Sequence, residues 1–459
     1  MKLQLSRIAE LIRGTGEFDK NSIAMAYSID SRTMKVGELF FAIRGEHLDG
    51  HDYVESALNA GAVGAVVCND AVARFTVKSR LISVDDTTRA LQQLGAAVRR
   101  IWGKKLIGIT GSAGKTTTKE CVAHVLASQL KVHKSVGNLN NHWGMPLQLL
   151  KLEQEHDIAV IEMGMNHAGE IRALAALAKP DIGIVTNVGP VHLENFDSIQ
   201  GIARAKYELI ESLPVGGLAV LNADDEFVSQ FGRDFKGKVV TFGMEKPADV
   251  RAENISVEGE KGTNFDVVGR GFRERAHMLL LGKHNVMNAC AAVAVAVEQG
   301  IAPERAVASL ASLAPSDKRG EMLHLGGATV INDCYNSNPK ALKSMVDALA
   351  TVTAKRRIVV AGEMLELGLT GTELHYECGR YMAQHGVHRV LGVRGNAKAL
   401  VEGARAAGAE AEFVETPEEA GQWLVRELKK DDAVLVKASR GVRLEKALEI
   451  LKSKFAEEK

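Results

Sequence analysis

The chain has 459 residues, which suggests about three domains at roughly 150 residues per domain. Hydrophobic residues make up 46% of the sequence and charged residues 25%, so the composition is that of a globular protein able to bury several cores. Its 57 basic residues balance its 57 acidic residues. This balance argues against a nucleic-acid-binding protein, in which a basic excess is expected.

The five cysteines are scattered along the chain and form no C-x-x-C pair. This pattern is typical of a reducing compartment and argues against a disulfide framework or a zinc site. Residues 1–14 mix charged and apolar residues and lack the apolar centre of a signal peptide. The longest apolar stretch, residues 289–297, is far shorter than the roughly 20 residues that span a bilayer. We therefore expect a cytoplasmic protein without a transmembrane segment.

Residues 1–102 form the first of three predicted blocks. Short apolar runs separated by Gly and Asp turns occupy residues 39–43, 62–68 and 81–84. The block closes on a helical pattern over residues 87–102 with one apolar face.

Residues 103–315 form the second block, in which strand and helix patterns alternate. Strands are expected at residues 106–110, 158–162, 182–187 and 219–222. This alternation predicts a parallel α/β sheet. Residues 237–282 are short alternating segments rich in glycine and predict a small antiparallel annex. A helix is expected next, over residues 285–299, with Asn285 as its N-cap.

Residues 316–459 form the third block, which follows a break at residues 314–317. Strands are expected at residues 328–332, 357–361, 389–393 and 433–436, and a helix at residues 340–350. These elements predict a second α/β unit. Asn338 and Pro339 suit the N-cap and the first turn of the helix.

A glycine-rich loop joins the first strand of the second block to the helix after it. The loop consists of Gly111, Ser112, Ala113, Gly114 and Lys115, and Thr116 and Thr117 open the helix. A strand, a glycine turn and a helix N-terminus bring several backbone N–H groups to one anion, so the loop is expected to bind the phosphates of ATP. Lys115 would reach the β- and γ-phosphates, and the Thr116 hydroxyl would bind Mg²⁺.

This loop is shorter than the usual phosphate-binding loop, because Ile109 stands where the first glycine is expected. The alternative is a plain glycine turn before a helix, but Lys-Thr-Thr-Thr directly after the turn argues against it. The chain contains no G-x-G-x-x-G motif, so a dinucleotide-dependent hydride-transfer enzyme is disfavoured.

Two polar residues follow strands of the second block. Glu162 ends a predicted strand, and the carboxyl ends of parallel strands face the ligand crevice. A carboxylate at that edge can hold Mg²⁺, which prefers oxygen ligands, although a surface glutamate at a strand end is the alternative. His192 comes after the next strand and would lie at the same crevice, but a lone histidine is more often structural.

Lys206 lies on the apolar stripe of a predicted helix over residues 198–213, in line with Ile199 and Ile210. A lysine that points inward is costly unless it is paired or modified. The alternative is that its amine reaches solvent along the helix.

Short motifs along the whole chain resemble the Mur ligases, in the order in which that family carries them. The first block contains DSR at 30–32, GELFFAIRG at 37–45 and DGH at 49–51. The second contains TGSAGKTTTK at 110–119, NLNNHWGMP at 138–146, EMG at 162–164, NVGPVHLE at 187–194 and AK at 205–206. The third contains NDCYNSNP at 332–339, GEMLELG at 362–368, His375 and KASRG at 437–441. The resemblance implies an N-terminal UDP-binding α/β domain, a central P-loop ATPase-like domain and a C-terminal Rossmann-like α/β domain.

The resemblance also implies an ATP-dependent carbon–nitrogen ligation through an acyl phosphate. Lys119, the Tyr-Asn-x-Asn-Pro segment at 335–339 and the later His375 are similar to the branch of the family that builds peptidoglycan precursors from UDP-N-acetylmuramoyl-tripeptide and D-alanyl-D-alanine. The Asp-Asn-Pro-Arg motif of the diaminopimelate-adding branch is absent. These two substrates are therefore the expected partners of a protein that we expect to be a monomer.

By this resemblance, Mg²⁺ would be held by Thr116 and Glu162, and a second Mg²⁺ would lie near His192 and a carbamylated Lys206. The carbamate would turn an inward cation into an oxygen ligand or the support of one. The expected catalytic residues are Lys115, His192, Lys206, Arg319 and Asp333.

The resemblance assigns further residues to the nucleotide. His284 and Asn288 match positions on the adenine side, Arg319 matches an arginine that meets the γ-phosphate, and Asp333 and Asn336 match ATP contacts from the C-terminal domain. Since these contacts come from two blocks, the third block is expected to close on the second about a hinge near residues 313–319.

Other residues match positions that face the two substrates. They are Ser31, Arg32 and His51 for the UDP moiety, Asn138 and Asn141 for the substrate and phosphate, and Ser439 and Arg440 for the peptide acceptor. Turn formation is the alternative role for the two asparagines.

Two other functions compete with this one. A folylpolyglutamate synthase-like enzyme would share the central and C-terminal design but lack the domain that carries DSR and DGH. A nucleotide-gated binding protein would not need Glu162, His192, Lys206 and Asp333 together.

Overall fold

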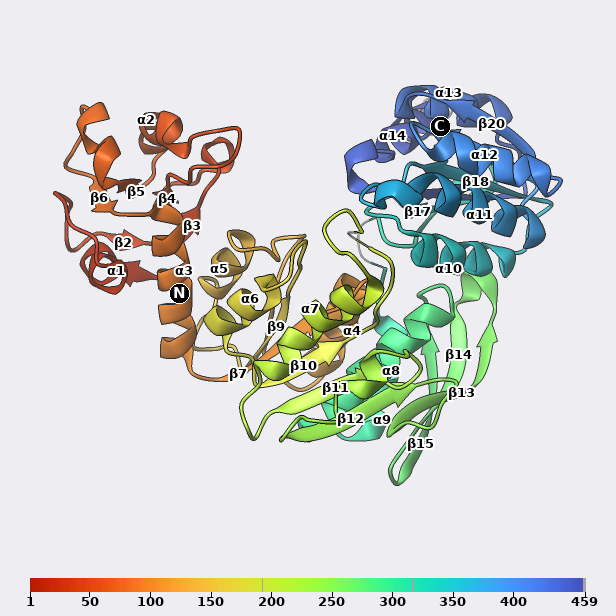
Figure 1. Cartoon of the computed structure of the whole chain (residues 1–459), viewed down its shortest axis with the longest axis horizontal. Coiled ribbons are helices and arrows are strands. Elements are labelled where there is room, and N and C mark those ends of the chain that lie inside the picture. The colour runs from red at the N-terminus through yellow and green to blue at the C-terminus, as the bar shows by residue number, and fades with distance from the viewer. Residues whose placement is uncertain (192, 316–317, 457–459) are drawn as a thin grey trace.

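The computed structural model describes residues 1–191, 193–315 and 318–456. Among these residues there is no helix with both the length and the apolar content needed to span a membrane. Three α/β units follow one another along the chain, as predicted (Figure 1).

The first unit is built on a four-stranded parallel sheet in the order β3-β4-β5-β6. Its strands are β3 (Ala26–Ser28), β4 (Glu38–Phe41), β5 (Gly64–Cys68) and β6 (Leu81–Val84). A short antiparallel pair, β1 (Leu3–Gln4) and β2 (Ile23–Ala24), lies beside them. The helices are α1 (Leu5–Ile12), α2 (Val54–Asn59) and α3 (Thr87–Trp102).

The second unit is a nine-stranded sheet in the order β15-β14-β13-β12-β11-β10-β7-β9-β8. Its strands are β7 (Lys105–Thr110), β8 (Val132–Lys134), β9 (Ile158–Glu162), β10 (Ile182–Val185), β11 (Leu218–Asn222), β12 (Lys238–Gly243), β13 (Val250–Val257), β14 (Thr263–Gly269) and β15 (Phe272–Met278). Its helices are α4 (Lys115–Ala127), α5 (Gly144–Leu149), α6 (Glu170–Ala178), α7 (Ile199–Glu211), α8 (Lys283–Glu298) and α9 (Pro303–Ser309).

The antiparallel annex predicted over residues 237–282 is confirmed for residues 250–278 and needs correction at β12. Strand β12 pairs parallel with β11, and β13 continues from it in the same direction. Strand β14 is antiparallel to both of its neighbours, β13 and β15. The segment therefore extends one edge of the central sheet, because its first strands find unpaired backbone groups there.

The third unit is a six-stranded sheet in the order β16-β17-β21-β18-β19-β20. Its strands are β16 (Glu321–Leu325), β17 (Ala328–Asp333), β18 (Arg356–Gly362), β19 (Arg389–Val393), β20 (Glu410–Val414) and β21 (Asp432–Lys437). Its helices are α10 (Pro339–Ala350), α11 (Gly371–Gln384), α12 (Ala397–Ala406), α13 (Pro417–Glu427) and α14 (Glu445–Ala456). The two edge strands, β16 and β20, were not predicted, since neither has the continuous apolar run of a buried strand.

Helix α3 has the predicted limits and ties the first unit to the second. The Asp86 carboxylate accepts a hydrogen bond from the Arg89 N–H at its start, and Gly103 ends it with a φ of 68°. Its buried residues Leu91, Leu94 and Val98 share one apolar cluster with residues of α1, α5 and α6. In Figure 1 this helix stands between the first sheet and the second.

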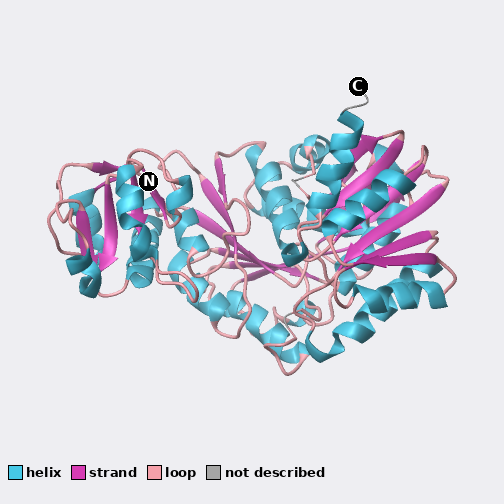
Figure 2. Ribbon diagram, turned by 90° about the horizontal axis from the view of Figure 1, so that it is seen from above, coloured by secondary structure: helices cyan, strands magenta, loops and turns pink. Residues whose placement is uncertain are grey.

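The topology brings several carboxyl ends of strands together. Strand β7 lies between β9 and β10, and all three are parallel, so Thr110, Glu162 and Val185 end at one edge. In the third unit, β17 and β21 are parallel neighbours that end at Asp333 and Lys437. Figure 2 shows the first and third units at opposite ends of the long axis, with the central sheet between them.

The buried carboxylate of Glu208 holds α7 to the start of α6. One of its oxygens accepts from the Gly169 N–H at 2.8 Å and the other from the Arg172 N–H at 3.0 Å. We expect Glu208→Ala to lower the free energy of unfolding by about 2–3 kcal/mol, because two N–H groups of the first turn lose their partner. Urea denaturation would measure this loss.

The matched control is Glu211→Ala on the same helix. Glu211 is exposed and pairs with the flexible Arg172 side chain, so its loss should change stability by less than about 0.5 kcal/mol. Equal effects of the two substitutions would contradict the capping role of Glu208.

Candidate active site

A cavity of about 690 Å³ lies between the glycine-rich loop and the third unit. Residues from both units line it, including Ser112, Ala113, Gly114, Lys115, Thr116, Thr117, Asn138, Asn140, Glu162, Asn187, His284, Asn288, Arg319, Asp333, Tyr335, Asn336, Lys437 and Arg440. The carboxyl ends of β9, β17 and β21 all contribute to it. The cavity therefore occupies the place expected of a ligand in an open α/β sheet.

The backbone of the loop can take this path only with glycine at two positions. Gly111 has a φ of 154° and Gly114 a φ of 79°. A Cβ atom on Gly111 would lie 1.9 Å from the Thr186 hydroxyl oxygen, so no side chain fits there. Helix α4 starts at Lys115, and the first N–H groups of a helix have no partner within it. The loop therefore forms a cradle of the kind that holds phosphate.

Two predicted phosphate-loop residues also brace the loop. The Ser112 hydroxyl donates to the Gly189 carbonyl at 3.1 Å and accepts from the Gly189 N–H at 2.9 Å. The Ala113 N–H donates to the Asn187 amide oxygen at 2.9 Å. Gly111 itself does not line the cavity, and its carbonyl accepts from the Lys115 amine at 2.8 Å. Asn187, to which no role was assigned from the sequence, therefore fixes the shape of the loop.

Thr116 and Glu162, the predicted Mg²⁺ ligands, are in direct contact. The Thr116 hydroxyl donates to one Glu162 oxygen at 2.6 Å, and the Asn140 amide donates to the other at 2.7 Å. Magnesium is commonly held by one or two protein oxygens together with phosphate oxygens. The described residues contain no group of three His, Cys, Asp or Glu side chains able to hold a metal alone. The oxygens present thus fit Mg²⁺ that is bound together with a nucleotide.

Lys119 supports Glu162 from behind. Its buried amine donates to the Ser135 carbonyl at 2.6 Å and pairs with Glu120 at 3.1 Å. The Ser135 hydroxyl accepts from the Glu162 N–H at 3.0 Å. The end of strand β9 is thereby fixed relative to helix α4, and this gives Lys119 a structural role next to the loop.

Lys206 points inward, as its sequence pattern predicted. It is 1% exposed, and no hydrogen bond or ion pair of its amine occurs within residues 1–191, 193–315 and 318–456. Burial, followed by the charge of Lys115, lowers the pKa of Lys206 well below its usual value. The alternative that its amine reaches solvent is wrong. His192, its predicted neighbour, lies outside the described residues.

The predicted adenine-side residues lie at the start of α8. The Asn288 oxygen accepts from the Thr118 hydroxyl at 2.9 Å, and both Asn288 and His284 line the cavity. Burial lowers the pKa of His284 to about 4, and its Nδ1 atom has no partner in the described part of the chain. Asn285 is not the N-cap, because the helix starts two residues earlier after Gly282. Its side chain instead donates to the Leu281 carbonyl and accepts from Asn288.

The third unit presents a buried ion pair to the cavity. The Lys437 amine lies 2.5 Å from the Asp333 carboxylate and donates to the Asn336 carbonyl at 2.8 Å. The sequence predicts Asp333 and Asn336 at this place, whereas it assigns no role to Lys437 of the KASRG segment. Asn338 is the N-cap of α10, as predicted, since its side chain accepts from the Ala341 N–H at 2.8 Å.

The two residues predicted to face the acceptor differ from each other. Arg440 lines the cavity and pairs with Glu445. Ser439 is buried, accepts from the Leu365 N–H at 3.0 Å and donates to the Ser337 carbonyl at 3.3 Å. Its hydroxyl thus joins two loops and does not face an acceptor, because both of its hydrogen-bonding directions are used inside the unit.

The asparagine motif at residues 138–146 places a different member at the site. Asn138 and Asn140 line the cavity, and Asn141 does not. The Asn141 oxygen accepts from the Trp143 and Gly144 N–H groups at 3.2 and 2.8 Å. Asn141 therefore takes the turn-forming role that was its alternative.

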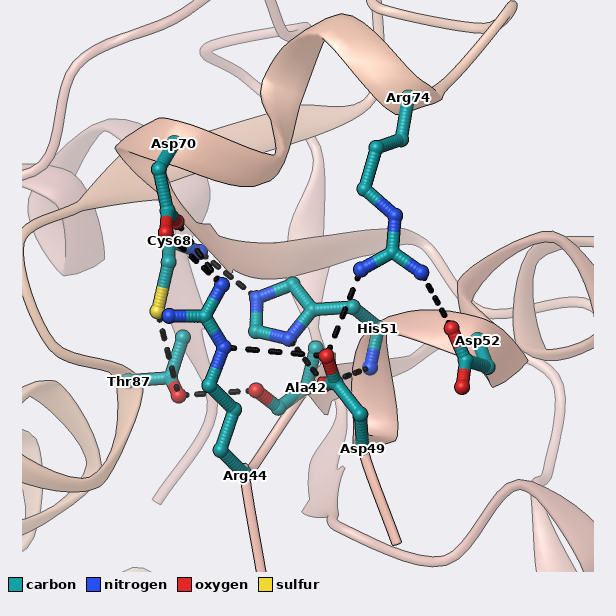
Figure 3. Close-up of polar contacts among 9 residues, drawn as sticks. All are labelled: Ala42, Arg44, Asp49, His51, Asp52, Cys68, Asp70, Arg74 and Thr87. Atoms are coloured by element: carbon teal, nitrogen blue, oxygen red, sulfur yellow. Dashed lines mark hydrogen bonds and ion pairs between the residues drawn. The ribbon is translucent and has the colours of Figure 1, made fainter.

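His51 in the first unit needs correction as a substrate contact. It is 2% exposed, and its Nδ1 atom donates to Asp49 at 2.6 Å while its Nε2 atom accepts from the Cys68 N–H at 2.9 Å. Figure 3 shows the ring held between these partners, with Arg44 and Arg74 beside Asp49. Both ring nitrogens are occupied, so His51 orders the loop that carries it.

Ser31 and Arg32 lie apart from the cavity, on the first unit. The Arg32 guanidinium donates to both Asp30 oxygens, at 2.8 and 2.7 Å, and is 86% exposed. Because the pair is open to solvent on the Arg32 side, Arg32 can exchange this half-buried carboxylate for a ligand at little cost. Contact of these two residues with UDP stays a prediction.

Three family models match the chain in order. They are the Mur ligase family catalytic domain at residues 25–135, the Mur ligase middle domain at residues 109–296 and the Mur ligase glutamate ligase domain at residues 318–440.

Relatives of full length agree with these models. The UDP-N-acetylmuramoyl-tripeptide–D-alanyl-D-alanine ligase of Bacillus subtilis strain 168 is 35% identical over 457 residues, or 98% of each chain. The enzyme of the same name from Escherichia coli K12 is 33% identical over 397 residues, or 86% of each chain.

Solved structures have the same fold over the whole chain. A crystal structure of MurF from Acinetobacter baumannii has a TM-score of 0.88 at 28% identity and covers 99% of both chains. The MurF ligase of Thermotoga maritima, solved in complex with ADP, has a TM-score of 0.82 at 27% identity and covers 95% of this chain and 99% of its own. The Mycobacterium tuberculosis folylpolyglutamate synthase shares only the fold, with 15% identity, a TM-score of 0.64 and 79% coverage of this chain and 94% of its own. The chain belongs to the Mur ligase family.

Proposed function

We propose that this chain is an ATP-dependent ligase that joins D-alanyl-D-alanine to the tripeptide carboxylate of UDP-N-acetylmuramoyl-tripeptide, a cytoplasmic step of peptidoglycan synthesis. The observation that carries the proposal is the cavity between the phosphate loop and the third unit, which Lys115, Arg319 and Asp333 line together. Relatives with that name match the chain over nearly its whole length. The five buried, unpaired cysteines are in keeping with a reducing compartment. That the enzyme acts as a monomer stays a prediction.

The competing ligase is less well supported. The DSR and DGH segments belong to a domain with a four-stranded N-terminal sheet. A folylpolyglutamate synthase-like enzyme is expected to lack this domain. The family models also cover that region from residue 25 onward.

The first chemical step needs positive charge, since a carboxylate must attack an anionic triphosphate. The carboxylate oxygen would bond to the γ-phosphorus as the bond to ADP breaks, giving an acyl phosphate. Lys115 at the loop and Arg319 at the linker are two cations that lie beside the cradle. Mg²⁺ held by Thr116 and Glu162 would neutralise further phosphate charge when bound.

The second step needs dry surroundings. The amine of the dipeptide would attack the acyl carbon and expel phosphate, and water would compete for the same carbon. The third unit covers the cradle with Asp333, Tyr335 and Asn336, and Arg440 lies on the same side. This arrangement supports closure of the third unit as the step that excludes water.

Carbamylation of Lys206 is part of the proposal. The lowered pKa favours the neutral amine, whose lone pair can attack the carbon of CO₂ with release of a proton. The product is an anion beside Lys115, the residue whose charge opposes protonation of Lys206. The modification would thus replace repulsion by attraction in the buried site.

We expect Lys206→Ala to lower kcat by about 100-fold, the upper end of the loss seen when the support of a metal site is removed. Incubation with ¹³C-bicarbonate should give a carbamate NMR signal in the native enzyme that is missing in the variant. Arg204→Ala, an exposed position on the same helix, is the control and should retain activity. Full activity of Lys206→Ala would refute this role.

The acceptor assignment predicts a strict requirement for both substrates. Phosphate release from ATP should need UDP-N-acetylmuramoyl-tripeptide and D-alanyl-D-alanine together, because the acyl phosphate forms on the first and is consumed by the second. A coupled phosphate assay with each substrate omitted in turn would measure this. Phosphate release with neither substrate, or only with a folate and glutamate, would exclude the proposed function.

A further inference from the structure

The guanidinium of Arg319 packs against the ring of Tyr335. The guanidinium carbon lies 3.8 Å from the centroid of the ring, within the range of a cation–π contact. Both residues line the cavity, and both are only partly exposed. Such contacts are strongest where the cation is partly desolvated.

The same arginine reaches the phosphate loop. A terminal nitrogen of Arg319 donates to the Thr116 hydroxyl at 3.0 Å. Thr116 follows the loop lysine directly and bonds Glu162. The charge of Arg319 is felt at the loop, since it lowers the pKa of Lys115, although burial is the larger cause. The cation is therefore held at the end of the cradle where the terminal phosphate of a nucleotide would lie.

The linker segment that bears Arg319 is attached to the third unit. The Tyr335 N–H donates to the Lys318 carbonyl at 3.2 Å, and the Lys318 amine pairs with Glu445 of α14 at 3.2 Å. Lys318 has a left-handed φ of 58°, which a non-glycine residue adopts only when its surroundings hold it. The segment that bears Arg319 is therefore anchored on the third unit, while the Arg319 side chain reaches across to Thr116.

We propose that Tyr335 is a positioning residue whose ring fixes the guanidinium of Arg319 over the phosphate loop, so that the site distinguishes a nucleoside triphosphate from a diphosphate only when the third unit is docked. The inference rests on the proposed function for the nucleotide alone. The ring makes the observed contact, since the guanidinium carbon lies 3.8 Å from its centroid.

The test compares the affinity of a non-hydrolysable ATP analogue with that of ADP by isothermal titration calorimetry. In Tyr335→Leu, the affinity for the triphosphate analogue should fall about 10-fold, which is within the strength of a cation–π contact. The affinity for ADP should change less than about 2-fold, because ADP lacks the phosphate that Arg319 faces. Tyr335→Phe keeps the ring and should restore the discrimination.

Tyr381→Leu is the matched control. The Tyr381 ring, on α11, also faces a cation, since the Lys343 amine lies 5.5 Å from the ring centroid, but Tyr381 does not line the cavity. It should leave both affinities as they are in the native protein. Native discrimination in Tyr335→Leu would overturn the inference, and so would an equal loss of both affinities. A defect in Tyr335→Phe as large as in Tyr335→Leu would also overturn it, because the hydroxyl would then be the active part.

A double-mutant cycle separates positioning from an independent contact. If Tyr335 acts through Arg319, adding Tyr335→Leu to Arg319→Ala should weaken triphosphate binding no further. Additive losses would overturn the inference. These binding measurements contain no D-alanyl-D-alanine, so their outcome does not depend on the proposed acceptor. The phosphate-release assay tests the acceptor separately.

Discussion

The hydrogen bond between Thr116 and Glu162 is the contact around which the site is arranged. It joins the first turn of α4 to the end of β9, two elements that meet only because β7 and β9 are parallel neighbours. Asn140 holds the second oxygen of Glu162, and Ser135 holds its backbone N–H. A carboxylate fixed at both oxygens and at its backbone has one orientation. Every charged group brought to the loop must accommodate that orientation.

Two lysines near the phosphate loop lie where a positive charge is disfavoured. Burial lowers the pKa of Lys115 and of Lys206, and each is further opposed by a neighbouring positive charge. The charge of Glu162 counters this effect at Lys115. An anionic triphosphate reverses the balance, because it supplies the negative charge that the folded protein lacks at this place. The positive charge gathered at the loop is thus a source of affinity for phosphate.

The sequence predicted what depends on local pattern. Helix α3 has the expected limits because Asp86 and Gly103 determine both ends. Lys206 was expected to point inward because its position on an apolar stripe determines its direction. The three α/β units follow from the alternation of strand and helix patterns.

The site predictions that were wrong concern residues whose hydrogen-bond partners the sequence pattern does not reveal. His51 accepts a hydrogen bond from the N–H of Cys68, 17 residues away, and Ser439 accepts one from the N–H of Leu365, 74 residues away. Neither partner has a side chain that marks it, since each contributes a backbone N–H. The choice between Asn140 and Asn141 is set by a turn whose backbone N–H groups take one amide oxygen. No spacing of residue types distinguishes these cases before the chain has folded.

The division of the site between two units has a physical reason. A phosphate loop must be rigid, because its N–H groups are useful only when they are already aligned, and Asn187 and Gly189 provide that rigidity within the central sheet. A ligase must also admit two large substrates and then exclude water, which a rigid enclosure cannot do. Attachment of Arg319 to the third unit meets both requirements. The loop stays rigid, and the arginine reaches it when the third unit docks. Because Arg319 stacks on Tyr335 of the third unit, docking of that unit over the loop also brings the guanidinium to the phosphates.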